Sequence, residues 1–353
     1  MNPSWSLVTA GQRVTVYDET GGYDRSLQHA AGLGGEVARG MVRPDVRIVL
    51  EANHRPFDHA GFSPITRGVW AGPGGETLLD SVGGSGFTQL WSVREAALTV
   101  RTRWTPTRAE LTAARAQRQG FARLRAQVLL HYPALWWAIV RDLVPLRVSV
   151  VDIGGLVVLL GGPTGTGTSS LLARELFAGA RGTCDNLGVS DGTVVHGLSE
   201  PLRLPADLPM PRHVPAQRGA AAAASGAVPG RVERAWLDRV PSLRPNMVVT
   251  LRRGNVETPA VVPLEAGLAR RHLVAGTMCA AELHRFWPLT AVLCLGTGKG
   301  PALAPIQGVA EQLTATLPCF QLTLGVQHRV ESGPMLRDLL PPALGSYSPA
   351  ARP

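Results

Sequence analysis

The chain has 353 residues, of which 45% are hydrophobic and 17% are charged. This length predicts about two domains, and the apolar fraction is large enough for a sizeable core. Together the 40 glycines and 28 prolines make up a smaller share of the chain than the ~25–30% that marks general disorder. The composition therefore excludes a wholly disordered chain, a coiled coil and a collagen-like repeat. The formal net charge of +9 permits an anionic partner such as a nucleotide, a nucleic acid or an acidic protein, without choosing among them.

The first part of the chain, residues 1–105, has the pattern of a β-rich module. A β-prone run covers residues 46–51, and glycines within 69–82 indicate two strands around a turn. Apolar and polar residues then alternate over 88–93 and 96–104, which is typical of half-buried strands.

Residues 106–144 are predicted to be a connecting helical segment. Pro106 fits the first helical turn, with Thr105 as the N-cap, and Pro133 is expected to end the helix. Trp136 and Trp137 are interpreted as core anchors. Four basic residues of the helix lie largely off its apolar face: Arg108, Arg115, Arg118 and Arg125. They form either a solvated face or an anion-binding surface.

Later segments alternate strands and helices, which predicts an α/β fold with a second domain core over 145–330. Strands at 148–151 and 156–160 flank Gly154-Gly155 as a hairpin, further strands are expected at 248–251, 261–262 and 290–295, and a helix at 305–316. Residues 206–231 are predicted to be a flexible insertion and 331–353 a tail.

Cysteine spacing and hydropathy predict a cytoplasmic protein with no membrane segment. The four cysteines lie far apart and are expected to be reduced and buried; they are Cys184, Cys279, Cys294 and Cys319. Residues 1–12 lack the pattern of a signal peptide, and charged residues interrupt the most apolar stretch, 128–160.

The sharpest motif follows the strand at 156–160 and precedes a predicted helix at 171–177. Glycines at three positions allow backbone N–H groups to surround phosphate oxygens, and the helix N-terminus adds partial positive charge. Ser169 stands where such loops ligate Mg²⁺, but Thr168 occupies the position of the usual lysine. A glycine-rich turn with no ligand is the alternative. The candidate cofactor-binding residues are Gly162, Pro163, Thr164, Gly165, Thr166, Gly167, Thr168, Ser169 and Ser170.

With these residues in place, the chain resembles the HPr kinase/phosphorylase-like proteins over roughly residues 90–330. Arg147 stands where the family has a histidine, followed by strand, turn, strand and phosphate loop at the family's spacing. Asp185-Asn186 stands where the family has an Asp-Asp pair. The segments 195–204 and 301–325 are similar to those of actinobacterial members of the family.

The resemblance implies a fold related to phosphoenolpyruvate carboxykinase, an ATP site with Mg²⁺, and phosphoryl transfer to a serine of a small protein or peptide. In this scheme Asp185 accepts the proton of the attacking hydroxyl or holds Mg²⁺, together with Ser169. Arg147 and Arg203 pair with phosphate oxygens. HPr kinases also form rings, so a homo-oligomer is a further expectation.

Three function classes stay open at this point. Thr168 and Asn186 also fit a pseudokinase that binds a nucleotide and acts as a regulator or scaffold. A nucleic-acid-binding protein is the less favoured reading of the arginine excess. Lys299, the only lysine of the chain, either supplies the positive charge that Thr168 lacks or lies in an exposed turn at 296–300.

Two weaker motifs have simpler interpretations. Residues 188–192 fit a G-x-S-x-G nucleophile elbow, but the next residues resemble a strand, so Asp191-Gly192 is expected to be a hairpin turn. His54, Asp58 and His59 are either metal ligands or, as we expect, part of an exposed loop.

Overall fold

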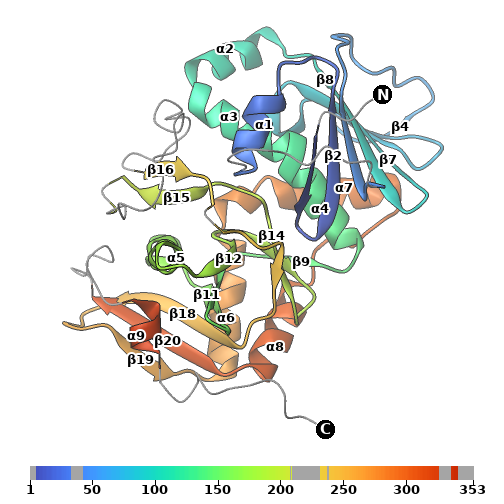
Figure 1. Ribbon diagram of the computed structural model, residues 1–353. Helices are drawn as coiled ribbons and strands as arrows, with labels where there is room; N and C mark the ends of the chain where they lie inside the picture. The colour runs from blue at the N-terminus through green and yellow to red at the C-terminus, as the bar shows by residue number, and fades with distance from the viewer. Residues whose placement is uncertain are drawn as a thin grey trace.

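The computed structural model describes residues 5–32, 43–206, 208, 231–236, 238–325 and 335–340. Within them the protein is a mixed α/β structure, with an eight-stranded and a six-stranded sheet as its main layers (Figure 1). The α/β class predicted from the sequence is therefore confirmed.

The eight-stranded sheet comes entirely from the first 104 residues and has the order β1-β2-β3-β8-β7-β6-β5-β4. The β2–β3 and β3–β8 pairs are parallel and the others are antiparallel. The strands are β1 (Trp5–Thr9), β2 (Gln12–Asp18), β3 (Val46–Leu50), β4 (Ser63–Thr66), β5 (Val69–Ala71), β6 (Thr77–Leu79), β7 (Phe87–Arg94) and β8 (Ala97–Trp104). Helix α1 (Asp24–Ala30) follows β2, and the single turn η1 (Val82–Gly84) follows β6.

The predicted connecting helix has one break, at Gln117, between α2 (Arg108–Ala116) and α3 (Arg118–Ala126). From α3 the helical backbone continues through a π-helical turn η2 (Gln127–His131) into α4 (Tyr132–Val140). The prediction of Thr105 as the N-cap was wrong, because Thr107 forms a reciprocal capping box with Glu110. The prediction that Pro133 ends the helix was also wrong. Pro133 lies in the first turn of α4, directly after the π-helical turn, and the backbone stays helical through it. Trp136 and Trp137 are buried, as predicted.

The six-stranded sheet has the order β12-β10-β11-β18-β20-β19. Its strands are β10 (Val148–Ile153), β11 (Leu156–Gly161), β12 (Arg181–Cys184), β18 (Met247–Gly254), β19 (Ala260–Pro263) and β20 (Cys319–Gly325). The predicted hairpin is confirmed, since β10 and β11 pair antiparallel. Helix α5 (Thr168–Phe177) packs on one face through Val158 and Leu160 of β11, whereas Leu159 belongs to the cluster that contains α6 (Ala266–Met278) and α8 (Ile306–Thr316).

Smaller strands complete the core. A four-stranded sheet contains β9 (Val144–Leu146), β13 (Gly188–Ser190), β14 (Val195–Gly197) and β17 (Ser242–Leu243), and β15 (Leu202–Pro205) pairs with β16 (Arg231–Arg234). The short helices η3 (Ala281–Leu283) and α9 (Leu336–Leu339) lie in the C-terminal part.

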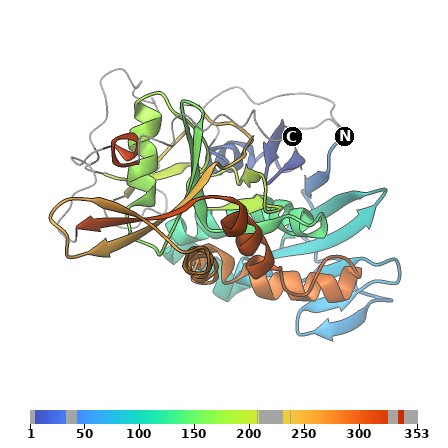
Figure 2. The same ribbon diagram turned by 90° about the horizontal axis from the view of Figure 1, so that it is seen from below.

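One predicted strand is a helix. Residues 290–295 lie in α7 (Phe286–Thr297), which packs against β4 to β7 of the first sheet (Figure 2). A short apolar run does not by itself distinguish a buried strand from a buried helix. Here the helical form covers a sheet made by the other end of the chain, and Gly298 ends it in the left-handed conformation.

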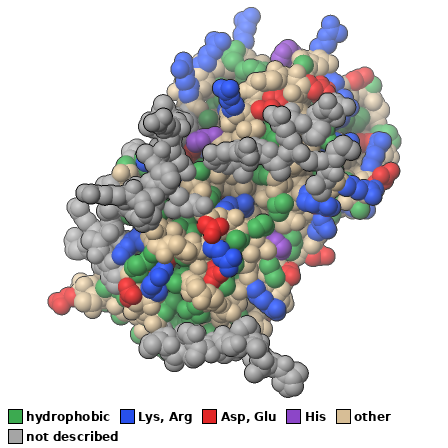
Figure 3. Space-filling model, in the orientation of Figure 1, with side chains coloured by type: hydrophobic (Ala, Val, Ile, Leu, Met, Phe, Trp, Pro, Cys, Tyr) green, Lys and Arg blue, Asp and Glu red, His purple; other side chains and the backbone are tan. Residues whose placement is uncertain are grey.

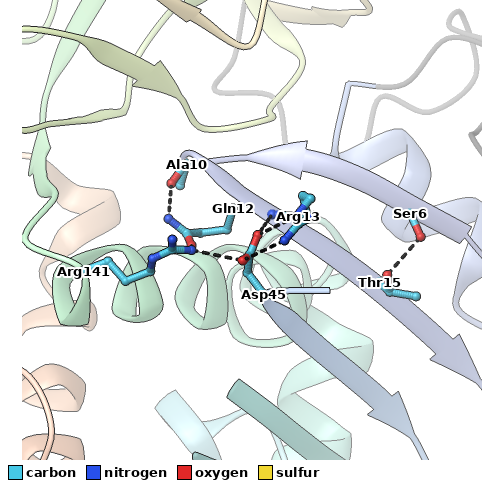
Figure 4. A network of polar contacts seen from close by, with 7 residues as sticks. All are labelled: Ser6, Ala10, Gln12, Arg13, Thr15, Asp45 and Arg141. Atoms are coloured by element: carbon cyan, nitrogen blue, oxygen red, sulfur yellow. Dashed lines mark hydrogen bonds and ion pairs between the residues drawn. The ribbon is translucent and has the colours of Figure 1, made fainter. Parts of the chain in front are cut away.

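A polar network joins the first sheet to the end of α4 (Figure 4). Asp45 accepts hydrogen bonds from the Arg13 backbone N and Nε, at 2.9 and 3.0 Å, and from Arg141 Nη1 at 3.0 Å. Arg141 Nη1 also donates to Gln12 Oε1 at 3.1 Å. Two strands and a helix are thus fixed around one carboxylate.

The cysteine prediction was correct in part. All four thiols are free, and Cys184 and Cys319 are buried, but Cys279 is exposed and Cys294 is partly exposed. In the described part of the chain, no helix is long and apolar enough to cross a membrane. Most of the predicted insertion, residues 209–230, and residues 341–353 of the predicted tail lie outside the described residues.

Candidate phosphate-binding site

The glycine-rich loop connects β11 to α5, as the sequence predicts, and its backbone requires glycine. Gly162, Gly165 and Gly167 have φ values of +148°, +87° and +108°, which L side chains rarely adopt. A Cβ atom on Gly162 would also lie 2.7 Å from the Leu251 carbonyl oxygen in β18. At Gly165 no atom lies within 4 Å of the corresponding position, so the loop is tight at its base and open at its tip.

Helix α5 directs its N-terminus toward this loop. Gly167 is the N-cap, and the first helical hydrogen bond runs from Leu171 N to Gly167 O at 3.0 Å. The amides of Thr168, Ser169 and Ser170 therefore have no acceptor within the helix. Together with the helix dipole they form the kind of positive end that binds anions.

A cavity of about 280 Å³ lies in front of the loop. Its walls bring together most of the predicted site residues: Arg147, Thr164, Gly165, Gly167, Thr168, Ser169, Ser170, Asp185 and Arg203. Gly162, Pro163 and Thr166 are not among the lining residues. They form the base of the loop, where Thr166 Oγ1 donates to Pro163 O at 2.9 Å.

Arg147 fixes the start of the loop. Its Nη1 donates to Gly162 O at 2.7 Å, and its backbone N donates to Thr277 Oγ1 of α6 at 3.0 Å. The guanidinium thus lies beside the cavity and is tied to the loop backbone at Gly162.

Asp185 follows β12 and is buried against β10. Its backbone oxygen accepts a hydrogen bond from the Ser149 hydroxyl, and Asp185 lines the cavity. Asn186 lines the same cavity, and its Nδ2 has no hydrogen-bond partner among the described residues. One cavity therefore brings together an acidic residue, an amide residue and the N-terminal residues of α5.

Arg203 is held by carboxylates. Glu282 and Glu200 lie 3.1 and 3.3 Å from its Nη atoms, and Glu233 lies 3.8 Å from Nε. Burial lowers the pKa of Arg203, but these carboxylates outweigh it and raise the pKa. Burial also raises the pKa of Glu200 to about 7, against the opposing effect of Arg203. The charge of Arg203 is therefore already matched by the protein.

Sequence reasoning missed two cavity residues. Arg123 of α3 and Glu282 of η3 line the cavity, yet they lie 39 residues before and 120 residues after the loop start at Gly162. Neither belongs to a local motif. For Arg123 the available signal was the arginine-rich face of the helix, which the sequence leaves open as either a solvated or an anion-binding surface.

The other candidate residues lie elsewhere. Lys299 is not among the residues that line the cavity, and its neighbours Gly296 and Gly300 lie against Thr77 and Val140. The turn interpretation of Asp191-Gly192 is confirmed, because β13 and β14 pair through Ser190 and Val195.

The prediction of an exposed loop around His54 and His59 is also confirmed. His54, Asp58 and His59 lie in an exposed loop, where His59 stacks on Trp70. No group of three or more His, Cys, Asp or Glu side chains suited to a metal ion occurs in the described part of the chain.

Comparison with known proteins adds no family assignment. Neither the scan against models of protein families nor the search of curated proteins finds a match to this chain.

Proposed function

We propose that this chain is an HPr-kinase-like, nucleotide-binding protein that transfers a phosphoryl group from ATP to a hydroxyl of a protein or peptide. The observation that carries the proposal is the cavity that is lined both by the N-terminal residues of α5 and by Asp185. Strand β11, its parallel neighbour β18 and helix α5 support a core of the phosphoenolpyruvate-carboxykinase type.

The residues present also fit Mg²⁺. Ser169 and Asp185 contribute a hydroxyl and a carboxylate to the same cavity, and Mg²⁺ prefers such oxygen ligands while keeping water and substrate phosphates in its remaining positions. When bound with ATP, Mg²⁺ neutralises charge on the phosphate oxygens.

The chain's own groups then have separate roles. The loop and α5 amides bind and orient the phosphates, because they point at one volume without reorganisation. Arg147 holds the loop at Gly162 O, and its positive charge at the cavity wall attracts phosphate oxygens. Asp185 accepts the proton of the acceptor hydroxyl, whose oxygen forms the new bond to phosphorus as the bond to the ADP oxygen breaks.

A second candidate function rests on Thr168 and Arg203. Thr168 lines the cavity at the position where a lysine would supply charge, and Arg203 is already paired with three carboxylates. These features favour a catalytically degenerate protein that binds the nucleotide and serves as a regulator or scaffold.

Transfer of labelled phosphate from ATP to acceptor peptides tests the proposal. Wild type should label a serine peptide, and Asp185→Asn should lose most of this activity, because it removes both the proton acceptor and the carboxylate offered to Mg²⁺. ATP should still bind this variant, more weakly, through the loop and the α5 amides. Asp58→Asn, an exposed carboxylate far from the loop cavity's lining, is the matched control. ATP binding without any transfer in wild type would favour the pseudokinase, and no ATP binding would contradict both.

A further inference from the structure

A second cavity, of about 380 Å³, adjoins the phosphate-loop cavity. The two share Arg123 and Arg203 as wall residues. The second cavity is formed by α1, α3 and the start of β15, which lie close together in Figure 1. We call it the arginine cavity.

Arginine side chains are concentrated in its walls. Four arginines line it, namely Arg25, Arg123, Arg125 and Arg203, of which Arg203 is already paired with carboxylates. His29 and His131 also line it, but burial lowers the pKa of His131 to about 4, so that imidazole is uncharged at neutral pH. Glu233 is the one carboxylate among its lining residues, and it already lies 3.8 Å from Arg203 Nε and 3.6 Å from His29 Nε2. Between the cations the wall consists of small side chains, including Ala30, Ala122 and Ala126, which leave room for a ligand.

Of these residues, Arg125 gives the strongest reason to expect an anionic ligand. Burial lowers the pKa of its guanidinium, and within the described residues no carboxylate forms an ion pair with it. Among the described residues its guanidinium contacts the Tyr23 ring, with Cζ 5.6 Å from the ring centroid. Arg125 is partly buried, and a charge that is partly removed from water is stabilised by an opposite charge, so an anionic ligand would complete its environment.

Arg25 adds an accessible cation at the mouth of the same cavity. It is exposed on α1 and takes part in no ion pair among the described residues. Exposed arginines also cover the nearby α2 and the start of α3, and Lys and Arg side chains project along this upper edge in Figure 3. Such a field attracts an acidic segment before it docks.

We propose that the arginine cavity binds an acidic side chain of the acceptor, close in sequence to the hydroxyl that enters the loop cavity. The shared wall of Arg123 and Arg203 makes the two cavities neighbours, so one short segment can occupy both. Carboxylates pair with arginine through two parallel hydrogen bonds. The assignment of the acidic group to the acceptor rests on the proposed function, but the binding of an oxyanion in the arginine cavity does not.

Calorimetric titration with two synthetic peptides tests the proposal. One peptide has a serine flanked by glutamates, and the other has glutamines in their place. Both are titrated into wild type, into the Arg25→Gln, Arg125→Gln double variant, and into a control with Arg115→Gln and Arg118→Gln. The control removes the same charge from exposed arginines that line neither cavity. Arg25→Gln alone serves as a second variant, since that exposed position tolerates substitution.

The glutamate peptide should bind wild type at least about tenfold more tightly than the glutamine peptide, as expected for one charge-assisted pair. The double variant should lose this preference, and Arg25→Gln should lose part of it, while the control keeps it. Equal losses in the control and the cavity variants would overturn the proposal, as would equal binding of the two peptides by wild type.

ATP titrated into the same proteins separates this proposal from the proposed function. If the glutamate peptide binds through Arg25 and Arg125 but ATP does not bind wild type, the arginine cavity stands and the nucleotide function fails. If the double variant loses ATP affinity as strongly as peptide affinity, the cavity serves the nucleotide and the acceptor assignment is wrong.

Discussion

At the scale of single residues, Thr168 determines how much catalysis the loop can support. It lines the cavity at the N-terminus of α5, where a hydroxyl can donate one hydrogen bond to a phosphate but supplies no charge. We expect Thr168→Lys to raise ATP turnover by about 10²-fold, the size of one well-placed electrostatic contribution. Steady-state kcat measures this, with Thr164→Lys on the exposed part of the loop as the control. The same gain in kcat in both variants would contradict this role of Thr168. No gain in a Thr168→Lys variant that still binds ATP would contradict it as well.

Glu200 gives a second residue-scale prediction, on stability. Burial raises its pKa from 4.5 to about 7 in the folded protein, so the folded state binds more protons than the unfolded state between these values. Its contribution to the free energy of unfolding therefore falls as pH rises from about 4.5 to about 7. In denaturant titrations across this window, Glu200→Gln should remove that part of the pH dependence. An unchanged slope would show that Glu200 ionises normally.

At the scale of elements, the turn from β11 into the loop depends on the absence of a side chain. Alanine at Gly162 would combine a strained φ with a Cβ 2.7 Å from Leu251 O. We expect Gly162→Ala to lower the free energy of unfolding by roughly 3 kcal/mol, as for other strained and overpacked sites. Gly154→Ala in the β10–β11 turn, with positive φ but open space, should cost only about 1 kcal/mol. Chemical denaturation of both proteins measures the difference, and equal losses would mean that β18 does not constrain the loop.

Local signals explain which elements the sequence could predict. The β10–β11 hairpin and the loop entering α5 are specified by neighbouring residues, namely Gly154-Gly155 and the glycines of the loop. The helical identity of residues 290–295 is decided instead by packing of α7 on strands made by the first 104 residues. The same applies to Arg123 and Glu282, which reach the cavity only through the folding of distant segments, so no local spacing could reveal them.

At the scale of the whole molecule, the Asp45 network joins the first sheet to the helical segment that leads to the core. Burial alone would raise the pKa of Asp45, but hydrogen bonds and charge from Arg13, with the charge of Arg141, outweigh it and lower the pKa. A lowered carboxyl pKa stabilises the fold above the unfolded value of 3.8 and loses that contribution as pH falls through the folded pKa.

Asp45→Asn should therefore lower Tm at neutral pH, because Arg13 and Arg141 lose their shared carboxylate. The difference from wild type should shrink below about pH 3.8, where the carboxyl of wild type is progressively protonated. Thermal unfolding followed by circular dichroism at both pH values measures this. If Asp45→Asn lowers Tm by the same amount at neutral pH and below about pH 3.8, the network acts through packing and not through charge.

The most direct test of the central claim is calorimetric titration of ATP, with and without Mg²⁺, into wild type, Gly165→Asp and Gly154→Asp. Both glycines have positive φ and open space for a side chain, but only Gly165 lines the loop cavity, where an added carboxylate repels phosphate. We predict Mg²⁺-dependent ATP binding in wild type and Gly154→Asp, and its loss in Gly165→Asp. No binding in wild type, or equal binding by all three proteins, would contradict a phosphate site at this loop.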